Sequence, residues 1–356
     1  MDNAPGIYGR QKGHNRRVEP KMDRNDCVNS TGNHNPVTNG LIGLAVGDAF
    51  GVPVEFLSRD EVESINPHDM LGKDCGVHLT SRWSDLIPRG AWSDDTSMTI
   101  AAMASIITHG GSIDYDDIMK QFLAWWEDGQ YTSLKFPFGL GTNISYALER
   151  YKQGTPALEC GGAGIRDNGN GALMRMFPFS MYCILKGCTD EETLGVIRNA
   201  AGITHRHEIN LMSCYMYTLF LRECMRTGDP STAYERAVFN KKKFYSDLFP
   251  HEAVDAHALL LNIDFRSTFN YRWIPENGYV VTSLAVLIYS ILSTDNYEDA
   301  VKTSVSFGYD TDTNAAITGS VAGVMYGTDN IPERWICHLI KRDYLKKIAE
   351  DFYRVI

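Results

Sequence analysis

The stretch GLIGLAVGDAFG at residues 40–51 combines a continuous apolar pattern with four regularly spaced glycines. The glycines fall at offsets 0, 3, 7 and 11, which is one face of an α-helix that Thr38 or Asn39 would cap. Glycine inside a helix costs roughly 1 kcal/mol relative to alanine. A row of four therefore predicts a buried helix whose glycine face lies against another backbone.

A second glycine face occurs near the end of the chain. A helix is expected from Asp312 to Tyr326, ended by Gly327, with Gly319, Gly323 and Gly327 at helical spacing. Because both faces would allow close backbone contact, we expect these two helices to pack against each other.

Helical signals dominate the rest of the chain. Ser93 is a candidate N-cap, with Asp94 and Asp95 in the first turn and Ile100, Met103 and Ile107 on an apolar face. Long runs of period-2 alternation are scarce, so the predicted class is all-α, a compact multi-helix globule. Further helices are predicted near residues 114–128, 142–153, 190–201, 208–226 and 279–292, and residues 228–278 are expected to form loops and short helices near a substrate entrance.

Composition narrows the functional classes. The chain has 356 residues, 44% of them hydrophobic, and a formal charge of −10, so a nucleic-acid partner is not expected. The most apolar stretch, Tyr279 to Leu292, is too short to span a bilayer, and we expect no membrane association and a cytoplasmic location. Eight cysteines without a C-x-x-C pair are expected to be reduced, mostly buried thiols.

Residues 1–37 differ in composition from the body at 38–356, which is predicted to be one catalytic domain. Six basic residues accompany four acidic ones, so this arm carries about +2 and the body about −12. The arm is poor in aliphatic residues and cannot bury enough apolar surface to fold alone. It is either a flexible tail or a segment that orders on the acidic cleft of a partner.

Two acidic motifs carry the chemistry. They are Ser93-Asp94-Asp95-Thr96 and Asp310-Thr311-Asp312-Thr313, each with two carboxylates beside hydroxyl groups. Mg²⁺ and Mn²⁺ prefer such oxygen ligands, and a cation would offset the repulsion between like charges. The first motif alone is equally typical of an ordinary helix N-terminus. An EF-hand starting at Asp310 is excluded, because Ala315 and Val321 occupy the positions that need Gly and Glu.

A glycine-rich segment, Asn168-Gly169-Asn170-Gly171-Ala172, could hold a diphosphate through its backbone amides. It matches neither the dinucleotide fingerprint nor a Walker motif, and alone it is also compatible with a tight turn. Thr204 and His205 could add polar groups nearby.

Taken together, these motifs resemble the ADP-ribosylglycohydrolase family. The resemblance is carried, in order, by residues 43–55, the turn at 93–96, the loop at 169–175, Thr204-His205 and residues 308–327. It implies an all-helical globule with a central cleft for two divalent cations, Mg²⁺ or Mn²⁺.

The resemblance also implies roles for individual residues. The metal ligands would be Ser93, Asp94 and Asp95 on one side and Asp310, Asp312 and Thr313 on the other. Asp94 and Asp312 would thereby serve catalysis, Glu55 would be the general acid or base, and Asp48 would support the Glu55 segment. Substrate would contact Asn143, Asn168, Gly169, Asn170, Gly171, Ala172, His205 and Tyr309, the last at a position where many members have Gly.

The implied activity is metal-dependent hydrolysis of the N-glycosidic bond between ADP-ribose and a modified protein side chain. Arginine is favoured, because the Glu55 segment is closer to the arginine-directed branch. Serine-linked or small conjugates, and a non-catalytic toxin-binding protein, are the alternatives. Some members give immunity against ADP-ribosyltransferase toxins, and residues 1–37 could bind such a toxin directly.

Overall fold

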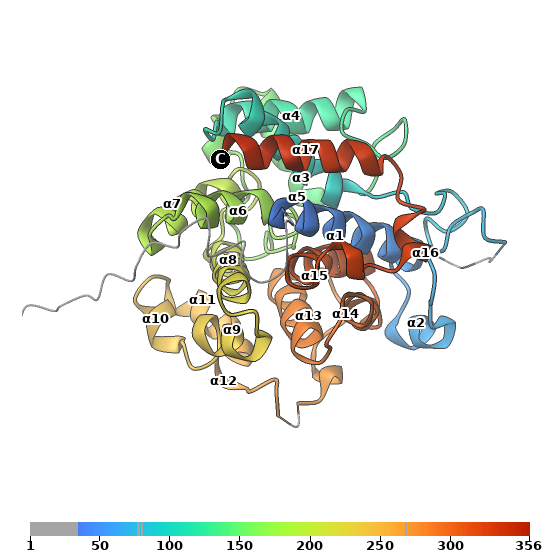
Figure 1. Ribbon diagram of the computed structural model, residues 1–356. Coiled ribbons are helices and arrows are strands. Elements are labelled where there is room, and N and C mark those ends of the chain that lie inside the picture. The colour runs from blue at the N-terminus through green and yellow to red at the C-terminus, as the bar shows by residue number, and fades with distance from the viewer. Residues whose placement is uncertain (1–34, 77–78, 80, 268) are drawn as a thin grey trace, which may run out of the picture.

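The computed structural model describes residues 35–356 except 77–78, 80 and 268, and this part of the chain is helical (Figure 1). It contains no β-strand, only two isolated bridges, Gly162 with His205 and Gly169 with Tyr279. The all-α prediction is therefore confirmed. The helices are α1 (Pro36–Gly51), α2 (Arg59–Ile65), α3 (Asp94–Thr108), α4 (Tyr115–Asp128), α5 (Thr142–Lys152), α6 (Phe177–Lys186), α7 (Asp190–Gly202), α8 (Glu208–Thr227), α9 (Pro230–Ala237), α10 (Lys242–Ser246), α11 (His251–Ala256), α12 (Ala258–Asn262), α13 (Val280–Leu292), α14 (Tyr297–Val305), α15 (Thr311–Tyr326), α16 (Glu333–Ile336) and α17 (Arg342–Val355), with 3₁₀ turns η1 (Val52–Val54), η2 (Ala157–Glu159), η3 (Tyr271–Trp273) and η4 (Thr328–Asn330).

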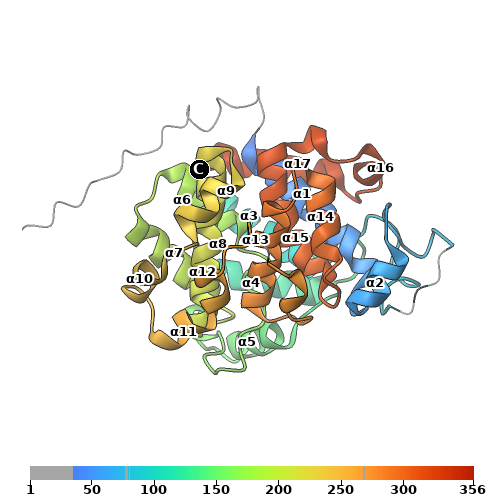
Figure 2. The ribbon, with the colours of Figure 1, turned by 90° about the horizontal axis from the view of Figure 1, so that it is seen from below.

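The two glycine-bearing helices lie side by side in the middle of the molecule (Figures 1 and 2). A Cβ atom added to Gly43 would lie 2.2 Å from the carbonyl oxygen of Gly319, and one added to Gly319 would lie 2.3 Å from that of Gly43. At Gly47 and Gly51 the same atom would meet the carbonyls of Ala315 and Thr311. The predicted packing of the two glycine faces is therefore confirmed.

Helix α1 is the central core helix. It begins earlier than predicted, since Asn35 is its N-cap and accepts hydrogen bonds from the N–H groups of Val37 and Thr38, with Pro36 at the first position. Residues Pro36–Val54 are long and apolar enough to span a membrane by length and composition, but 94% of that window is buried inside the protein. The apolar surface of α1 is thus covered by other helices, as expected of a helix that is hydrophobic all round.

In the view of Figure 1, other helices lie above and below this pair. Helix α17 packs on α1 and α3, and α4 packs on α3. Helices α13 and α14 cover the opposite side of α15, and α8 joins α13 to α7 and α9. The ends of α1, α3 and α15 are thereby fixed relative to one another.

Most predicted helices occur within a few residues of their expected bounds, but α2, α6, α14, α16 and α17 were not predicted. Residues 228–278 do form short helices and turns. None of them lines the cavity beside the acidic motifs, but Gly278 lies against Asp310 and its carbonyl accepts a hydrogen bond from the Asn170 N–H, so their expected place near a substrate entrance stays a prediction.

The prediction of a flexible arm falls mostly on residues outside the described part of the chain. Of the expected reduced thiols, seven cysteines are described and all are free, four of them buried: Cys160, Cys183, Cys214 and Cys224.

Candidate active site

The acidic motifs meet where three helix ends converge. Asp48 lies in the last turn of α1, Asp94 and Asp95 in the first turn of α3, and Asp312 in the first turn of α15. Helix N-termini carry a partial positive charge, so α3 and α15 both favour carboxylates at this place. Segments more than two hundred positions apart in the sequence thus share one site, as predicted.

Asp48 holds the first motif in place. Its carboxylate accepts hydrogen bonds from the backbone N–H of Ser93 at 2.9 Å and from both the N–H (3.1 Å) and the hydroxyl (2.7 Å) of Thr96. The supporting role predicted for Asp48 therefore acts on the first turn of α3, which it ties to α1. Ser93 in turn donates its hydroxyl to Asp95 at 3.1 Å.

The carboxylates form two groups that could each hold a metal ion. In one, ligand oxygens of Asp48, Asp95 and Asp312 lie within 4.8 Å of one another. In the other, those of Glu55, Asp310 and Asp312 do so. Asp312 belongs to both groups, so the second acidic motif contributes a carboxylate to each of them. This differs from the predicted grouping, in which residues 93–95 and residues 310–313 formed separate sets and Asp48 and Glu55 stood outside them.

Burial makes these charges costly without a cation. It raises the pKa of Asp94 to about 8, with Asp48 and Asp310 adding repulsion, and the pKa of Asp48 to about 6. Burial likewise raises the pKa of Asp95 and Asp312 well above the ordinary value, and neighbouring carboxylates add to it. One oxygen of Asp95 is buried with no hydrogen-bond partner among the described residues. An all-oxygen donor set with an unpartnered buried oxygen fits a hard divalent cation.

Glu55 stands at the edge of this cluster. It follows η1 and is largely buried, and one of its oxygens accepts a hydrogen bond from the indole N–H of Trp83. Burial raises the pKa of Glu55 well above its ordinary value, with the charges of Asp310 and Asp94 as further causes. Trp83 lies in a loop with no recognisable motif, and the sequence analysis did not identify it.

A cavity of about 310 Å³ opens beside the carboxylates. Among the predicted site residues, its lining includes Glu55, Asp94, Asn143, Gly169, Asn170, Gly171, His205, Asp310, Asp312 and Thr313. Ser93 and Asp95 are buried beneath it, and Asn168 and Ala172 are buried without lining it. The prediction that Asn168 and Ala172 face substrate is therefore not supported. Tyr309 lies outside the lining and is 41% exposed.

The glycine loop is held from both sides. The Asn170 side-chain amide donates to Asp310 at 2.6 Å and to Ser283 of α13 at 2.9 Å, while Asn210 of α8 donates to the carbonyl of Gly169. The Asn170 N–H is bound to the Gly278 carbonyl, whereas no described residue accepts from the N–H of Gly169 or Gly171. Two amides of the predicted diphosphate loop are thus available to a ligand.

His205 closes the wall behind this loop. Burial, with the nearby charge of Arg175, lowers the pKa of His205 to about 3, so the ring is neutral. A Cβ atom on Gly171 would lie 3.0 Å from the His205 ring and 2.9 Å from Ile144, which explains the need for glycine there.

The sequence analysis missed several lining residues, of which Arg166 and Gly139 bear most directly on the site. Arg166, on the exposed turn before the glycine loop, brings a basic side chain to the lining of the cavity. Gly139 has φ +91° and packs its backbone on Asp94, where a Cβ atom would lie 2.2 Å from the carboxylate oxygen. Neither stands in a motif that marks it in the sequence.

Comparisons with known proteins agree with this geometry. A family model described as ADP-ribosylglycohydrolase matches residues 30–356. The chain is 28% identical to "ADP-ribosylarginine hydrolase Tri1" of Serratia proteamaculans (strain 568), over 88% of this chain and 77% of that protein. It is 26% identical to "ADP-ribosyl-[dinitrogen reductase] glycohydrolase" of Rhodospirillum rubrum, over 86% and 90% of the two chains.

A solved structure titled "ADP-ribosylglycohydrolase-related protein complex" has the same fold. Its TM-score is 0.67 at 24% identity, and the match covers 90% of this chain and 98% of that one. Because the family model spans nearly the whole described chain and its motif residues converge on one cavity, the protein belongs to the ADP-ribosylglycohydrolase family.

Proposed function

We propose that the chain hydrolyses the N-glycosidic bond between ADP-ribose and an arginine side chain, and so reverses mono-ADP-ribosylation of a protein. The observation that carries this proposal is a cavity with two carboxylate groups sharing Asp312 on one side and a glycine loop on the other. The names of the relatives from Serratia and Pseudomonas, both ADP-ribosylarginine hydrolases, support the choice of arginine.

Two divalent cations, Mg²⁺ or Mn²⁺, fit the donor set. The residues that would hold them are Ser93, Asp94, Asp95, Asp310, Asp312 and Thr313, with Asp48 and Glu55 adjoining. In such a site the chemistry that bound cations supply is polarisation of the ribose hydroxyls and of a water molecule. The carboxylates of the chain orient that water and stabilise the positive character that develops at ribose C1″.

Glu55 would transfer the proton. A water oxygen forms a bond to C1″ while the bond from C1″ to the guanidine nitrogen breaks. Water loses one proton and the leaving nitrogen gains one, and Glu55 can transfer a proton on each side of this exchange. Its side chain lines the cavity, and the hydrogen bond from Trp83 fixes one of its carboxylate oxygens. Burial favours the protonated form that such a relay requires.

The remaining wall would bind the ADP part of the substrate. The free N–H groups of Gly169 and Gly171 and the guanidinium of Arg166 suit a diphosphate. Asn143 and neutral His205 offer hydrogen bonds without adding charge.

A hydrolysis assay on substrates of defined linkage tests this function. Arginine-linked and serine-linked ADP-ribosyl proteins are incubated separately with the enzyme while Mg²⁺ or Mn²⁺ is titrated after EDTA treatment. We expect release of ADP-ribose from the arginine conjugate only, with activity lost in EDTA and restored by the cation. Full activity of metal-free enzyme would refute the mechanism, and cleavage of the serine conjugate alone would change the substrate class. Release from neither conjugate would favour a non-catalytic protein or a small-molecule substrate.

The arm at residues 1–37 extends the proposal to immunity. Its charge of about +2 on an otherwise acidic chain suits the acidic cleft of an ADP-ribosyltransferase toxin. Removal of residues 1–34, which precede the α1 cap at Asn35, should weaken binding to such a toxin and spare hydrolysis. Unchanged affinity would refute this role. A cytoplasmic location is part of the same proposal.

A further inference from the structure

Two exposed aromatic side chains stand next to the carboxylates. Phe56 follows Glu55 and Tyr309 precedes Asp310, and their exposed fractions are 46% and 41%. The rings meet edge to face, with centroids 5.7 Å apart and planes at 80°. Phe56 also lines the cavity. We call this pair the aromatic rim.

The backbone of the rim adopts an unusual conformation. Phe56 has φ +66° and Tyr309 φ +60°, a left-handed region that aromatic residues rarely occupy. Two reciprocal contacts maintain it, since the Phe56 N–H donates to the Tyr309 carbonyl and the Tyr309 N–H to the Leu57 carbonyl, both at 2.6 Å. Strained residues of this kind cluster at ligand-binding sites, where the surrounding structure enforces them.

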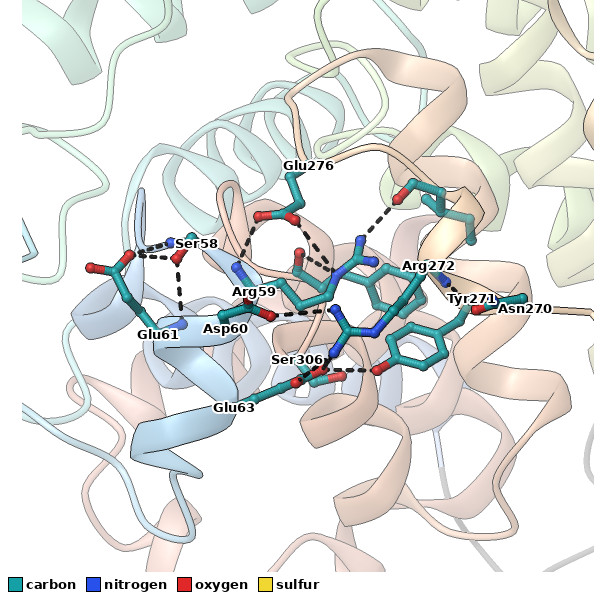
Figure 3. Close-up of polar contacts among 12 residues, drawn as sticks. Ser58, Arg59, Asp60, Glu61, Glu63, Asn270, Tyr271, Arg272, Glu276 and Ser306 are labelled. Atoms are coloured by element: carbon teal, nitrogen blue, oxygen red, sulfur yellow. Dashed lines mark hydrogen bonds and ion pairs between the residues drawn. The ribbon is translucent and has the colours of Figure 1, made fainter.

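A buried arginine links the two segments that carry the rim. Arg59 is 3% exposed and donates to the carbonyls of Ile274 at 2.8 Å and Phe307 at 3.4 Å, while its own backbone N–H donates to Glu276 (Figure 3). Gly308 packs against the Arg59 backbone, where a Cβ atom would lie only 2.5 Å from the nitrogen. The segments that carry Phe56 and Tyr309 are thus fixed to each other before any ligand arrives.

The position of the rim indicates which part of a substrate it meets. It adjoins Glu55 and Asp310, whereas the amides suited to a diphosphate belong to the glycine loop. A group leaving from C1″ near Glu55 would therefore pass the two rings. A guanidinium matches this surface, because aromatic faces attract cations and the adjoining side chains are carboxylates.

We propose that Phe56 and Tyr309 bind the guanidinium of the arginine side chain and so form the leaving-group subsite, an inference that rests on the proposed function. The rim selects cationic conjugates over neutral ones.

Glycine variants remove the rings without opposing the backbone, since glycine readily adopts positive φ. We expect Tyr309→Gly and Phe56→Gly each to raise KM for ADP-ribosylarginine on the order of tenfold, with a smaller change in kcat. Tyr309→Phe keeps the ring and should stay close to the parent enzyme. Tyr344→Ala removes an equally exposed tyrosine (40%) on α17 and should change neither constant.

The inhibition constant of ADP-ribose separates the outcomes, because this product lacks the arginine. We expect the glycine variants to bind it as the parent enzyme does. Weaker ADP-ribose binding would mean that the rim holds the adenine or ribose instead, and an unchanged KM would likewise overturn the subsite. If the parent enzyme cleaves no arginine conjugate, the proposed function fails first, which is a different result.

Discussion

At the scale of single residues, Asp312 holds the two halves of the site together. Its carboxylate belongs to both oxygen groups, whereas Asp310 belongs to one. The backbone N–H of Thr313 donates to it at 2.8 Å, so the first turn of α15 fixes its orientation. Loss of the Asp312 charge therefore affects both groups, whereas loss of any other carboxylate affects only one of them.

We therefore expect Asp312→Asn to reduce the number of bound divalent cations from two to none, and Asp310→Asn to leave one. Asparagine keeps the shape of the side chain, so both variants should remain folded. Equilibrium dialysis with Mn²⁺, followed by metal analysis, measures the stoichiometry, and circular dichroism checks the fold. Two ions retained by Asp312→Asn would contradict the shared role.

The residues of the site were predictable to the extent that they stand in short motifs. Asp94 and Asp312 each sit at a helix start beside hydroxyl groups, and that local pattern marks them. Trp83 and Arg166 reach the cavity only through the path of loops, which depends on the whole fold. The position of Asn168 away from the cavity lining has the same cause, since its carbonyl is bound by the N–H of Val280 and its side chain donates to the Ile165 carbonyl.

At the scale of elements, the contact between α1 and α15 depends on the absence of side chains. A methyl group on Gly43 would lie 2.2 Å from the Gly319 carbonyl oxygen and 2.9 Å from the Gly323 Cα, and neither backbone atom can move alone. Both helices carry site residues at their ends. Any separation of the pair would therefore displace Asp48 relative to Asp312.

We expect Gly43→Ala to lower the free energy of unfolding by about 1–3 kcal/mol through overpacking, despite the better helix propensity of alanine. Gly195 in the exposed face of α7 is the matched control, because a Cβ atom there meets nothing within 4 Å. Gly195→Ala should raise the free energy of unfolding by roughly 0.5–1 kcal/mol. Urea denaturation of both variants in EDTA measures this, and equal effects would argue against the close contact.

The helices that were predicted and those that were missed differ in their signals. The glycine spacing of α1 and the N-cap of α3 were recognised, although α1 starts earlier because Asn35 and Pro36 form its cap. Helix α17 buries Leu345, Ile348, Ala349 and Phe352, a regular helical spacing that the sequence does contain. The sequence therefore contains enough signal to predict α17, whereas the order in which helices pack around α1 could not be derived from one sequence.

At the scale of the whole molecule, the fold encloses a negative cluster in its interior. The chain is acidic overall, and burial removes the water that would otherwise screen these carboxylates. Core packing around α1 and α15 must offset this repulsion when no cation is bound. Stability and cation binding are consequently linked through the protonation of the same groups.

The sign of this linkage follows from the pKa shifts. Folding raises the pKa of Asp48 to about 6 and that of Asp94 to about 8, from an ordinary value of 3.8. Their contribution to stability is fully present below the unfolded pKa and is lost as pH rises through the folded values. The buried histidines act oppositely, since the pKa of His205 falls to about 3 and that of His257 to about 4, so their contribution is lost as pH drops below 6.5.

We therefore expect metal-free protein to lose stability most clearly between about pH 6.5 and pH 8, because there the unfolded carboxylates are ionised, the folded ones still hold protons and the histidines no longer titrate. Added Mg²⁺ binds the deprotonated form, so the rise in Tm that it produces should grow over the same range. Thermal unfolding at matched ionic strength, with Mg²⁺ or with EDTA, measures this difference, and Asp312→Asn serves as the control that should lose it. A Tm difference that is absent, or constant across this range, would mean that these carboxylates do not bind the cation, because protons and cation would then not compete for the same oxygens.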